Sequence, residues 1–273
     1  MRRERWPGAG STLSRRSARL SAVSEEIRVV RLGLVGYEEA LALQKRLERD
    51  RQAGAAPDTL LLLEHHPVFT KGRRTDPSHL PMGEDWYRMQ GIEVCETDRG
   101  GQVTYHGPGQ LVAYPIVRLP DDDVTAYVRG LERVMIEALG DYGVGAQVFE
   151  GLTGVWTAGD PPIAAGEVGP QRTPVGAAAL PGGEARKIGS IGIHVNKGVT
   201  THGLAINVNN DLQPFEWVVP CAIEGVRMTS VCRELGAEQD MDGFATVIRD
   251  RFAAAFGRRA VEADVATLIP VRT

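Results

Sequence analysis

Cys221 is the residue of this chain best suited to covalent chemistry. The sequence has three cysteines, Cys95, Cys221 and Cys232, and no CxxC pair, so it indicates neither a disulfide framework nor a structural zinc site. Cys95 falls in a predicted strand and Cys232 in a short helical run, where free cysteines usually serve as small core residues. Cys221 follows Pro220 at the end of an apolar run. We therefore expect Cys221 to be a nucleophile, with an inert thiol as the alternative.

Two sets of residues could activate that thiol. Lys187 lies at the start of a predicted strand in the run RKIGSIGI (186–193), where a lysine usually points to solvent. In an apolar cleft, desolvation would instead lower its pKa and make it a usable base. His202 and Asn207 flank another apolar run, and such residues are commonly satisfied by local hydrogen bonds. With Cys221 they could also form a papain-like set, so the sequence leaves both bases open.

The segment 99–110, RGGQVTYHGPGQ, is the densest cluster of unusual residues. Its glycines could simply close a hairpin turn, or they could let backbone amides approach a ligand. Turn chemistry alone does not account for the interleaved Arg99, Thr104 and His106. The sequence contains no P-loop or Rossmann fingerprint. His65 and His66 have no third ligand placed to complete a metal site, so we expect no metal.

Charge and composition describe a folded, acidic body with a basic N-terminus. The 273 residues carry a formal net charge of −4, yet residues 1–22 hold six arginines and one acid. We expect a disordered tail there, which also resembles a mitochondrial presequence, and one catalytic domain over residues 23–273. An acidic body argues against a nucleic-acid groove, and no apolar run is long enough to span a membrane. Residues 158–185, rich in Gly, Pro and Ala, are predicted to be a disordered insertion.

Periodicity predicts a mixed, largely antiparallel sheet with packed helices, an α/β (α+β) fold. Helical spacing indicates helices over Tyr37–Gln52, Val124–Leu139 and Asp242–Phe256, the second capped by Asp123. The run Thr59–Leu63 is typical of a strand buried on both faces. Gln102–Tyr105 and Leu111–Val117 look like neighbouring strands of a hairpin. The other predicted strands are 27–32, 92–96, 145–149, 155–157, 187–195 and 204–208.

Five blocks in order resemble the lipoyl(octanoyl) transferases. The blocks are EHHPVFTKGR (64–73), RGGQVTYHGPGQLVAYP (99–115), RKIGSIGIHV (186–195), THGLAINV (201–208) and PCAI (220–223). The resemblance covers about residues 27–257. It implies a fold like the catalytic domains of lipoate and biotin protein ligases. The basic tail and the lengthened 158–185 segment depart from the family pattern.

The resemblance implies the first step of endogenous protein lipoylation. An octanoyl or lipoyl group would pass from acyl carrier protein through a Cys221 thioester to a lysine of a lipoyl domain. Acceptors would be the E2 subunits of 2-oxoacid dehydrogenases and the glycine cleavage H protein. Lys187 would lower the pKa of Cys221. The residues that match the family's substrate-binding stretches are Arg99, Gly100, Gly101, Gln102, Val103, Thr104, Tyr105, His106, Ser190, Ile191, Gly192, His202, Gly203 and Leu204.

The chemistry of a thioester donor agrees with this assignment, because the donor is already activated and no ATP or other cofactor is needed. Gly189, Gly192 and Gly203 would leave room for an acyl chain and present amides to the oxyanion. Arg73, Arg74 and Arg99 could form a local basic surface for the acidic carrier protein. We expect a cytoplasmic enzyme, or a mitochondrial one if residues 1–22 are a presequence. The alternatives are an ATP-dependent lipoate or biotin ligase and a non-catalytic binder of carrier proteins or lipoyl domains.

Overall fold

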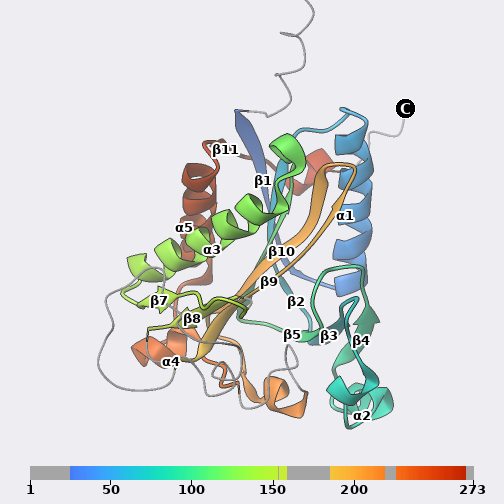
Figure 1. Ribbon diagram of the computed structural model, residues 1–273, viewed down its shortest axis with the longest axis vertical. Coiled ribbons are helices and arrows are strands. Elements are labelled where there is room, and N and C mark those ends of the chain that lie inside the picture. Colours follow the sequence, from blue (N-terminus) through green and yellow to red (C-terminus); the bar gives the residue numbers. More distant parts are fainter. Residues whose placement is uncertain (1–24, 153, 159–184, 219–225, 269–273) are drawn as a thin grey trace, which may run out of the picture.

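The computed structural model describes residues 25–152, 154–158, 185–218 and 226–268. The predicted tail, nearly all of the predicted insertion, and Cys221 lie outside these residues. The described chain forms an eight-stranded sheet, a three-stranded sheet and helices that pack on them (Figure 1).

The large sheet has the strand order β11-β1-β2-β6-β10-β9-β8-β7, and the small sheet has the order β4-β3-β5. The strands of the large sheet are β1 (Glu26–Val35), β2 (Thr59–His65), β6 (Gln110–Ile116), β7 (Ala146–Gln147), β8 (Val155–Thr157), β9 (Lys187–Asn196), β10 (Val199–Asn207) and β11 (Arg259–Glu262). The small sheet contains β3 (Val68–Lys71), β4 (Glu93–Glu96) and β5 (Val103–His106). The helices are α1 (Tyr37–Gln52), α2 (Glu84–Met89), α3 (Val124–Asp141), α4 (Val231–Leu235) and α5 (Met241–Ala255).

The predicted fold class is confirmed. Strand β1 runs parallel to β2 and β11, and every other neighbouring pair in the large sheet is antiparallel. Strand β2 is buried on both faces, as its continuous leucines predict. Leu60 and Leu62 belong to the core beside α3 and α5, whereas Leu61 and Leu63 belong to the core beside α1. The two-residue period of a strand thus divides one apolar run between two cores.

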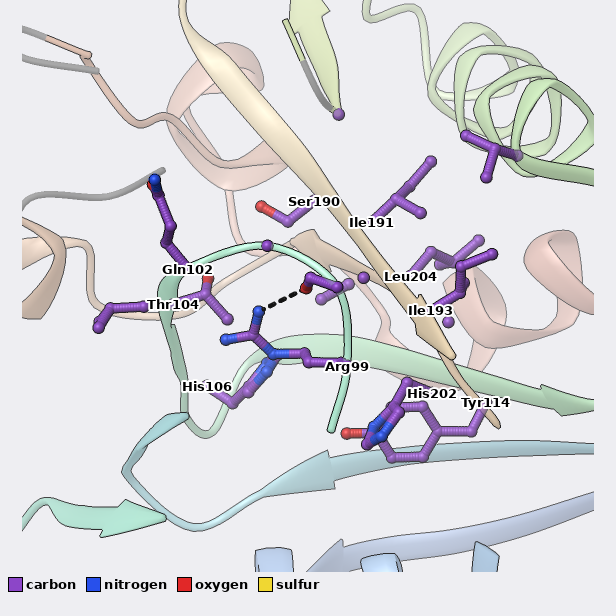
Figure 2. A pocket seen from close by; sticks show the side chains of 18 of the residues that line it. Arg99, Gln102, Thr104, His106, Tyr114, Ser190, Ile191, Ile193, His202 and Leu204 are labelled. Carbon is purple, nitrogen blue, oxygen red and sulfur yellow. Dashed lines mark hydrogen bonds between the residues drawn. The ribbon is translucent and has the colours of Figure 1, made fainter. Parts of the chain in front are cut away.

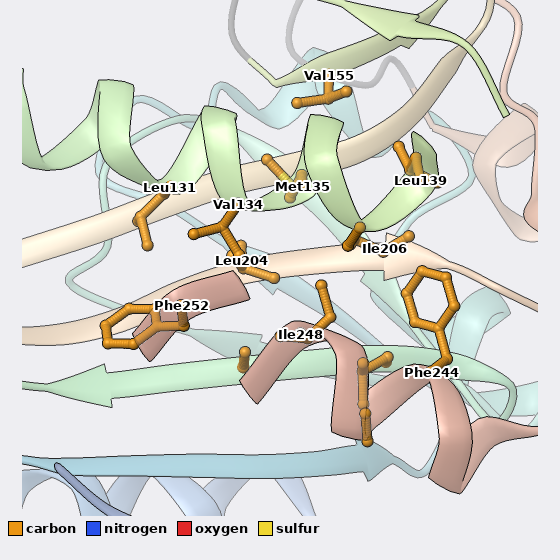
Figure 3. Close-up of a cluster of buried hydrophobic side chains, with 14 of the residues drawn as sticks. Leu131, Val134, Met135, Leu139, Val155, Leu204, Ile206, Phe244, Ile248 and Phe252 are labelled. Atoms are coloured by element: carbon orange, nitrogen blue, oxygen red, sulfur yellow. The ribbon is translucent and has the colours of Figure 1, made fainter. Parts of the chain in front are cut away.

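The larger core lies between the sheet and helices α3 and α5 (Figure 3). Helix α3 contributes Leu131, Val134, Met135 and Leu139, and α5 contributes Phe244, Ile248 and Phe252, all of them fully buried. Each such side chain stabilises the fold by roughly 1.5–3 kcal/mol through burial. The predicted cap of α3 is confirmed, since an Asp123 carboxylate oxygen accepts a 2.9 Å hydrogen bond from the Ala126 amide.

The predicted hairpin between Gln102–Tyr105 and Leu111–Val117 is wrong. Strand β5 pairs with β3 in the small sheet, while β6 pairs with β2 and β10 in the large one. The glycine-rich segment therefore joins two sheets. Gly109 has a φ of +84°, its amide donates to Glu64 Oε2 at 2.6 Å, and a Cβ there would meet the backbone of Asn210 at 2.7 Å. These contacts explain glycine at this position without a hairpin.

Candidate functional site

A cavity of about 200 Å³ lies where the segment that precedes β5 crosses β9 and β10 (Figure 2). Lys187 and every predicted substrate-binding residue except Tyr105 line it. Tyr105 turns instead into the core of the small sheet, where its ring lies 5.5 Å from the rings of both Phe69 and Phe215. Sequence blocks that are about a hundred residues apart thus meet around one space.

The cavity borders one edge of β9. Strand β8 pairs with the start of β9 through Val155 and Gly189, and farther along the Gly100 amide donates to the Ile193 carbonyl at 2.9 Å. Residues 190–192 lie between these two contacts and line the cavity. The small residues in this stretch permit the close approach of the 99–101 segment, because a Cβ on Gly192 would lie 3.1 Å from Arg99 Cδ.

The expectation that Gly203 leaves room for an acyl chain is wrong. A Cβ on Gly203 would overlap the carbonyl oxygen of Ala113 in β6, so the missing side chain serves the close packing of two strands. The space beside Gly189 is filled by Met135, whose sulfur would lie 2.8 Å from an added Cβ. Glycine at these two positions is explained by protein packing.

Arg99 places a buried guanidinium at the cavity (Figure 2). It is 7% exposed, and Thr70 orients it: Nη2 donates to the Thr70 carbonyl at 2.6 Å and Nε donates to Thr70 Oγ1 at 3.1 Å. A guanidinium held this way can bind a carbonyl or another electron-rich group. The expectation that Arg99 belongs to a basic surface is wrong, whereas Arg73 and Arg74 are exposed.

His106 is held as a neutral imidazole on the cavity wall. Desolvation lowers its pKa well below the usual value, and its Nδ1 donates to Gln110 Oε1 at 2.6 Å. Gln110 in turn donates to Asn207 Oδ1 at 2.9 Å, which fixes the orientation of its amide. The Tyr37 ring stacks on the His106 ring at a centroid distance of 6.3 Å. His106 therefore presents a fixed Nε2 acceptor.

His202 has an unusual backbone and a buried ring. Its φ of +58° lies in the left-handed region, and its amide donates to Gln44 Oε1 at 2.7 Å. Its Nε2 donates to Asp98 Oδ1 at 2.8 Å, and this contact helps to hold the pKa of Asp98 well below its usual value. Burial lowers the pKa of His202 itself. The surrounding contacts thus fix both the backbone and the ring.

His202 and Asn207 do not form a papain-like pair in the described structure. Asn207 Nδ2 donates to the Thr229 carbonyl at 3.0 Å, and its Oδ1 accepts from Gln110, whereas the His202 ring contacts Asp98. Each side chain is committed to different partners. This arrangement favours the lysine over the histidine as the base.

Lys187 is 2% exposed, so the solvent-facing alternative is wrong. Its Nζ lies 5.7 Å from the ring centroid of Trp156. Its amide donates to the Arg227 carbonyl at 2.8 Å, and its carbonyl accepts from the Thr229 amide at 2.9 Å. A lysine buried at a cavity wall is a common arrangement for proton transfer. Cys221 lies outside the described residues, so its role stays a prediction.

Sequence reasoning missed several residues of the cavity wall: Tyr37, Arg74, Tyr114, Val128, Glu132, Gly154, Ile193 and Ala205. Tyr37 and Tyr114 fit their helix and strand patterns as ordinary core residues. Glu132 gave a usable signal, because it is a carboxylate beside the apolar stripe of a predicted helix. Asp98 and Gln44, which fix His202, carried no distinctive pattern.

Within residues 25–152, 154–158, 185–218 and 226–268, no three His, Cys, Asp or Glu side chains gather as metal ligands. His65 and His66 thus lack a third ligand there. No helix in the same ranges is long and apolar enough to cross a bilayer.

The chain matches known proteins along most of its length. Residues 36–253 match the model of the lipoyl protein ligase A/B catalytic domain. An octanoyltransferase of Thermobifida fusca is 42% identical, with 82% of this chain and 85% of that protein covered. One of Chloroflexus aggregans is 42% identical, covering 86% and 97%. One of Myxococcus xanthus is 41% identical over 90% of this chain, which spans 63% of that relative's length.

Solved structures share the fold. A bi-partite lipoate protein ligase from Thermoplasma acidophilum superposes with a TM-score of 0.65 at 17% identity, covering 89% of this chain and 90% of that one. A lipoate-protein ligase A bound with ATP gives 0.63 at 18% identity, covering 89% and 92%. The family model and the sequence relatives show that the chain belongs to the lipoyl protein ligase A/B catalytic domain family, as an acyltransferase of its octanoyltransferase group.

Proposed function

We propose that this acyltransferase moves an octanoyl or lipoyl group from acyl carrier protein to a lysine of a lipoyl domain, through a thioester on Cys221. The observation that carries the proposal is the buried Lys187 at the wall of a cavity that Arg99, His106 and His202 also line. Arg227 and Thr229, which follow Cys221 by six and eight residues, bond to the backbone of Lys187. The chain therefore passes beside the backbone of Lys187 a few residues after Cys221.

The proposed reaction has two transfers. In the first, the Cys221 thiolate attacks the carbonyl of the donor thioester, and the carrier's thiol leaves with the proton that Lys187 took from Cys221. In the second, the amine of the acceptor lysine attacks the enzyme thioester, gives a proton to Lys187, forms an amide and releases the Cys221 thiolate. Lys187 takes the thiol proton before the first attack. Thioester exchange is nearly energy-neutral and amide formation runs downhill, so the proposal needs neither ATP nor another cofactor.

The cavity offers groups for both parts of the acyl thioester. Val128, Ile191 and Leu204 provide an apolar wall, and Arg99 and His106 provide polar groups on another part of the lining. A ligand with an apolar tail and a polar carbonyl fits such a mixed cavity. Arg73 and Arg74 are exposed beside the 99–101 segment, since their amides donate to the Arg99 and Gly101 carbonyls at 3.1 and 3.0 Å. We expect them to contact the acidic carrier protein.

The acceptors in this proposal are lipoyl domains of 2-oxoacid dehydrogenase E2 subunits and the glycine cleavage H protein. The Thermoplasma ligase of similar fold is described together with its E2 lipoyl domain. A lysine side chain that carries the acyl group away must reach the cavity wall near Lys187. This requirement suits a small folded domain with an exposed lysine.

A transfer assay separates the proposal from its alternatives. The enzyme is mixed with an apo lipoyl domain and either octanoyl carrier protein without ATP, or free octanoate with ATP and Mg²⁺. We expect octanoylated domain from the carrier protein only. Product from octanoate and ATP alone would identify a ligase. No product from either donor, with both partners bound, would identify a non-catalytic binder.

A further inference from the structure

Glu132 of α3 lines two separate cavities. One is the cavity of about 200 Å³ described above, and the other, of about 910 Å³, lies along α3 and α5. No other described residue lines both. Glu132 is 6% exposed, so its side chain is part of the wall between the two spaces.

The wall stands at the apolar side of the smaller cavity. Val128 precedes Glu132 by one helical turn and lines the smaller cavity with Ile191, Ile193 and Leu204. Figure 2 shows Ile191, Ile193 and Leu204 lying toward the helix, away from Gln102, Thr104 and His106. An acyl chain whose carbonyl lies among the polar groups would extend toward Val128 and Glu132.

An ion pair holds Glu132 in this position. Arg129 Nη1 donates to Glu132 Oε2 at 2.8 Å, and Arg129 lines only the larger cavity, with a side chain that is 60% exposed. Arg129 therefore binds the Glu132 carboxylate from the side of the larger cavity, while the Glu132 side chain stays between the two cavities. Beyond it, Tyr127, Ile136 and Phe256 form an apolar part of the larger cavity, whose lining also includes charged residues such as Arg133 and Arg258.

We propose that Glu132 is the residue that sets acyl chain length, by closing the acyl cavity against the larger cavity behind it. The inference rests on the proposed function, because it takes the smaller cavity as the acyl site. A chain longer than the natural one would have to displace a buried, ion-paired carboxylate, which is unfavourable. Removing the side chain would join the apolar end of the smaller cavity to the larger cavity and admit a longer chain.

Chain-length profiles of acyl-enzyme formation test the inference. Octanoyl and dodecanoyl carrier proteins are compared by kcat/KM in the wild type and in Glu132→Ala. We expect Glu132→Ala to raise the ratio of dodecanoyl to octanoyl at least tenfold. Glu132→Gln keeps the bulk of the side chain and should leave the ratio within threefold of the wild type. Val128→Phe adds bulk to the same wall and should favour hexanoyl over octanoyl at least tenfold.

Glu137→Ala is the matched control, because Glu137 is a carboxylate of the same helix that lines only the larger cavity. Its profile should equal that of the wild type. An unchanged profile in folded Glu132→Ala, or an equal change in Glu132→Gln or Glu137→Ala, would overturn the inference. If Glu132→Ala does not fold, the chain-length profile of Val128→Phe is used instead, and a profile equal to that of the wild type would overturn the inference. A wild type that forms no octanoyl adduct refutes the proposed function, and this inference with it. If the wild type does form the adduct, the proposed function stands, and the chain-length profiles of the variants test the inference separately.

Discussion

His65 makes folding stability depend on pH in a way that the structure allows us to calculate. The ring is fully buried, its Nδ1 donates to the Val35 carbonyl at 3.1 Å, and its Nε2 accepts from the Tyr114 hydroxyl at 2.8 Å. Both contacts suit the neutral imidazole. Desolvation lowers the pKa of His65 from 6.5 to about 4.

The sign follows from the depressed pKa of a base. Between pH 6.5 and 4 the unfolded chain binds a proton at His65 that the folded chain does not, so stability falls as pH falls through this window. The fall of this pKa from 6.5 to about 4 corresponds to roughly 3 kcal/mol in full. Between pH 7 and pH 5, about 2 kcal/mol of this contribution is lost.

Urea unfolding at pH 7 and pH 5 measures the effect, with His65→Gln as the variant that cannot titrate. We expect the free energy of unfolding of the wild type to fall by about 2 kcal/mol more than that of His65→Gln over this interval. His66→Gln is the matched control at the neighbouring, exposed histidine and should behave as the wild type. Equal pH dependence in the wild type and His65→Gln would refute the reasoning.

Three further predictions concern packing and the site. Gly203→Ala should lower the free energy of unfolding by about 2 kcal/mol or more, because the added Cβ would overlap the Ala113 carbonyl. Gly140→Ala, where an added Cβ meets nothing, should raise the free energy of unfolding by up to about 1 kcal/mol. Thermal melts of both variants measure these changes. Thr70→Val should raise the KM for octanoyl carrier protein about tenfold, because Arg99 loses its hydrogen bond to the Thr70 hydroxyl. Thr70→Ser keeps the hydroxyl and should keep the wild-type KM. An unchanged KM in Thr70→Val would contradict this role. Lys187→Met should slow acylation at least a hundredfold and move thiol alkylation by iodoacetamide to higher pH; identical alkylation profiles would remove Lys187 from its role.

The fold was predictable where the pattern was long or continuous. The spacing of Tyr37, Ala40 and Leu47 marked α1, and the leucines of β2 marked a strand with two buried faces. The strands β3 (VFTK) and β11 (RAVE) were missed because neither shows a clear alternating or continuous apolar pattern. The hairpin prediction failed because a local pattern does not say which distant strand supplies the partner.

The cavity was predictable only in part. Arg99, His106 and Lys187 stood out because their types were unusual for their surroundings. Tyr37 and Val128 belong to helices whose spacing is satisfied by ordinary packing, so nothing local distinguished them, whereas Glu132 was a carboxylate beside an apolar stripe and was overlooked. The Asp98 contact to His202 joins residues 104 positions apart, and only the tertiary structure reveals it.

Intact-mass measurement after incubation with octanoyl carrier protein tests the covalent mechanism most directly. The wild type should gain the mass of one octanoyl group, and Cys221→Ala should gain none. Cys95→Ala and Cys232→Ala, at the other two cysteines, should be acylated as the wild type is. An octanoyl adduct that persists in Cys221→Ala would contradict the thioester mechanism.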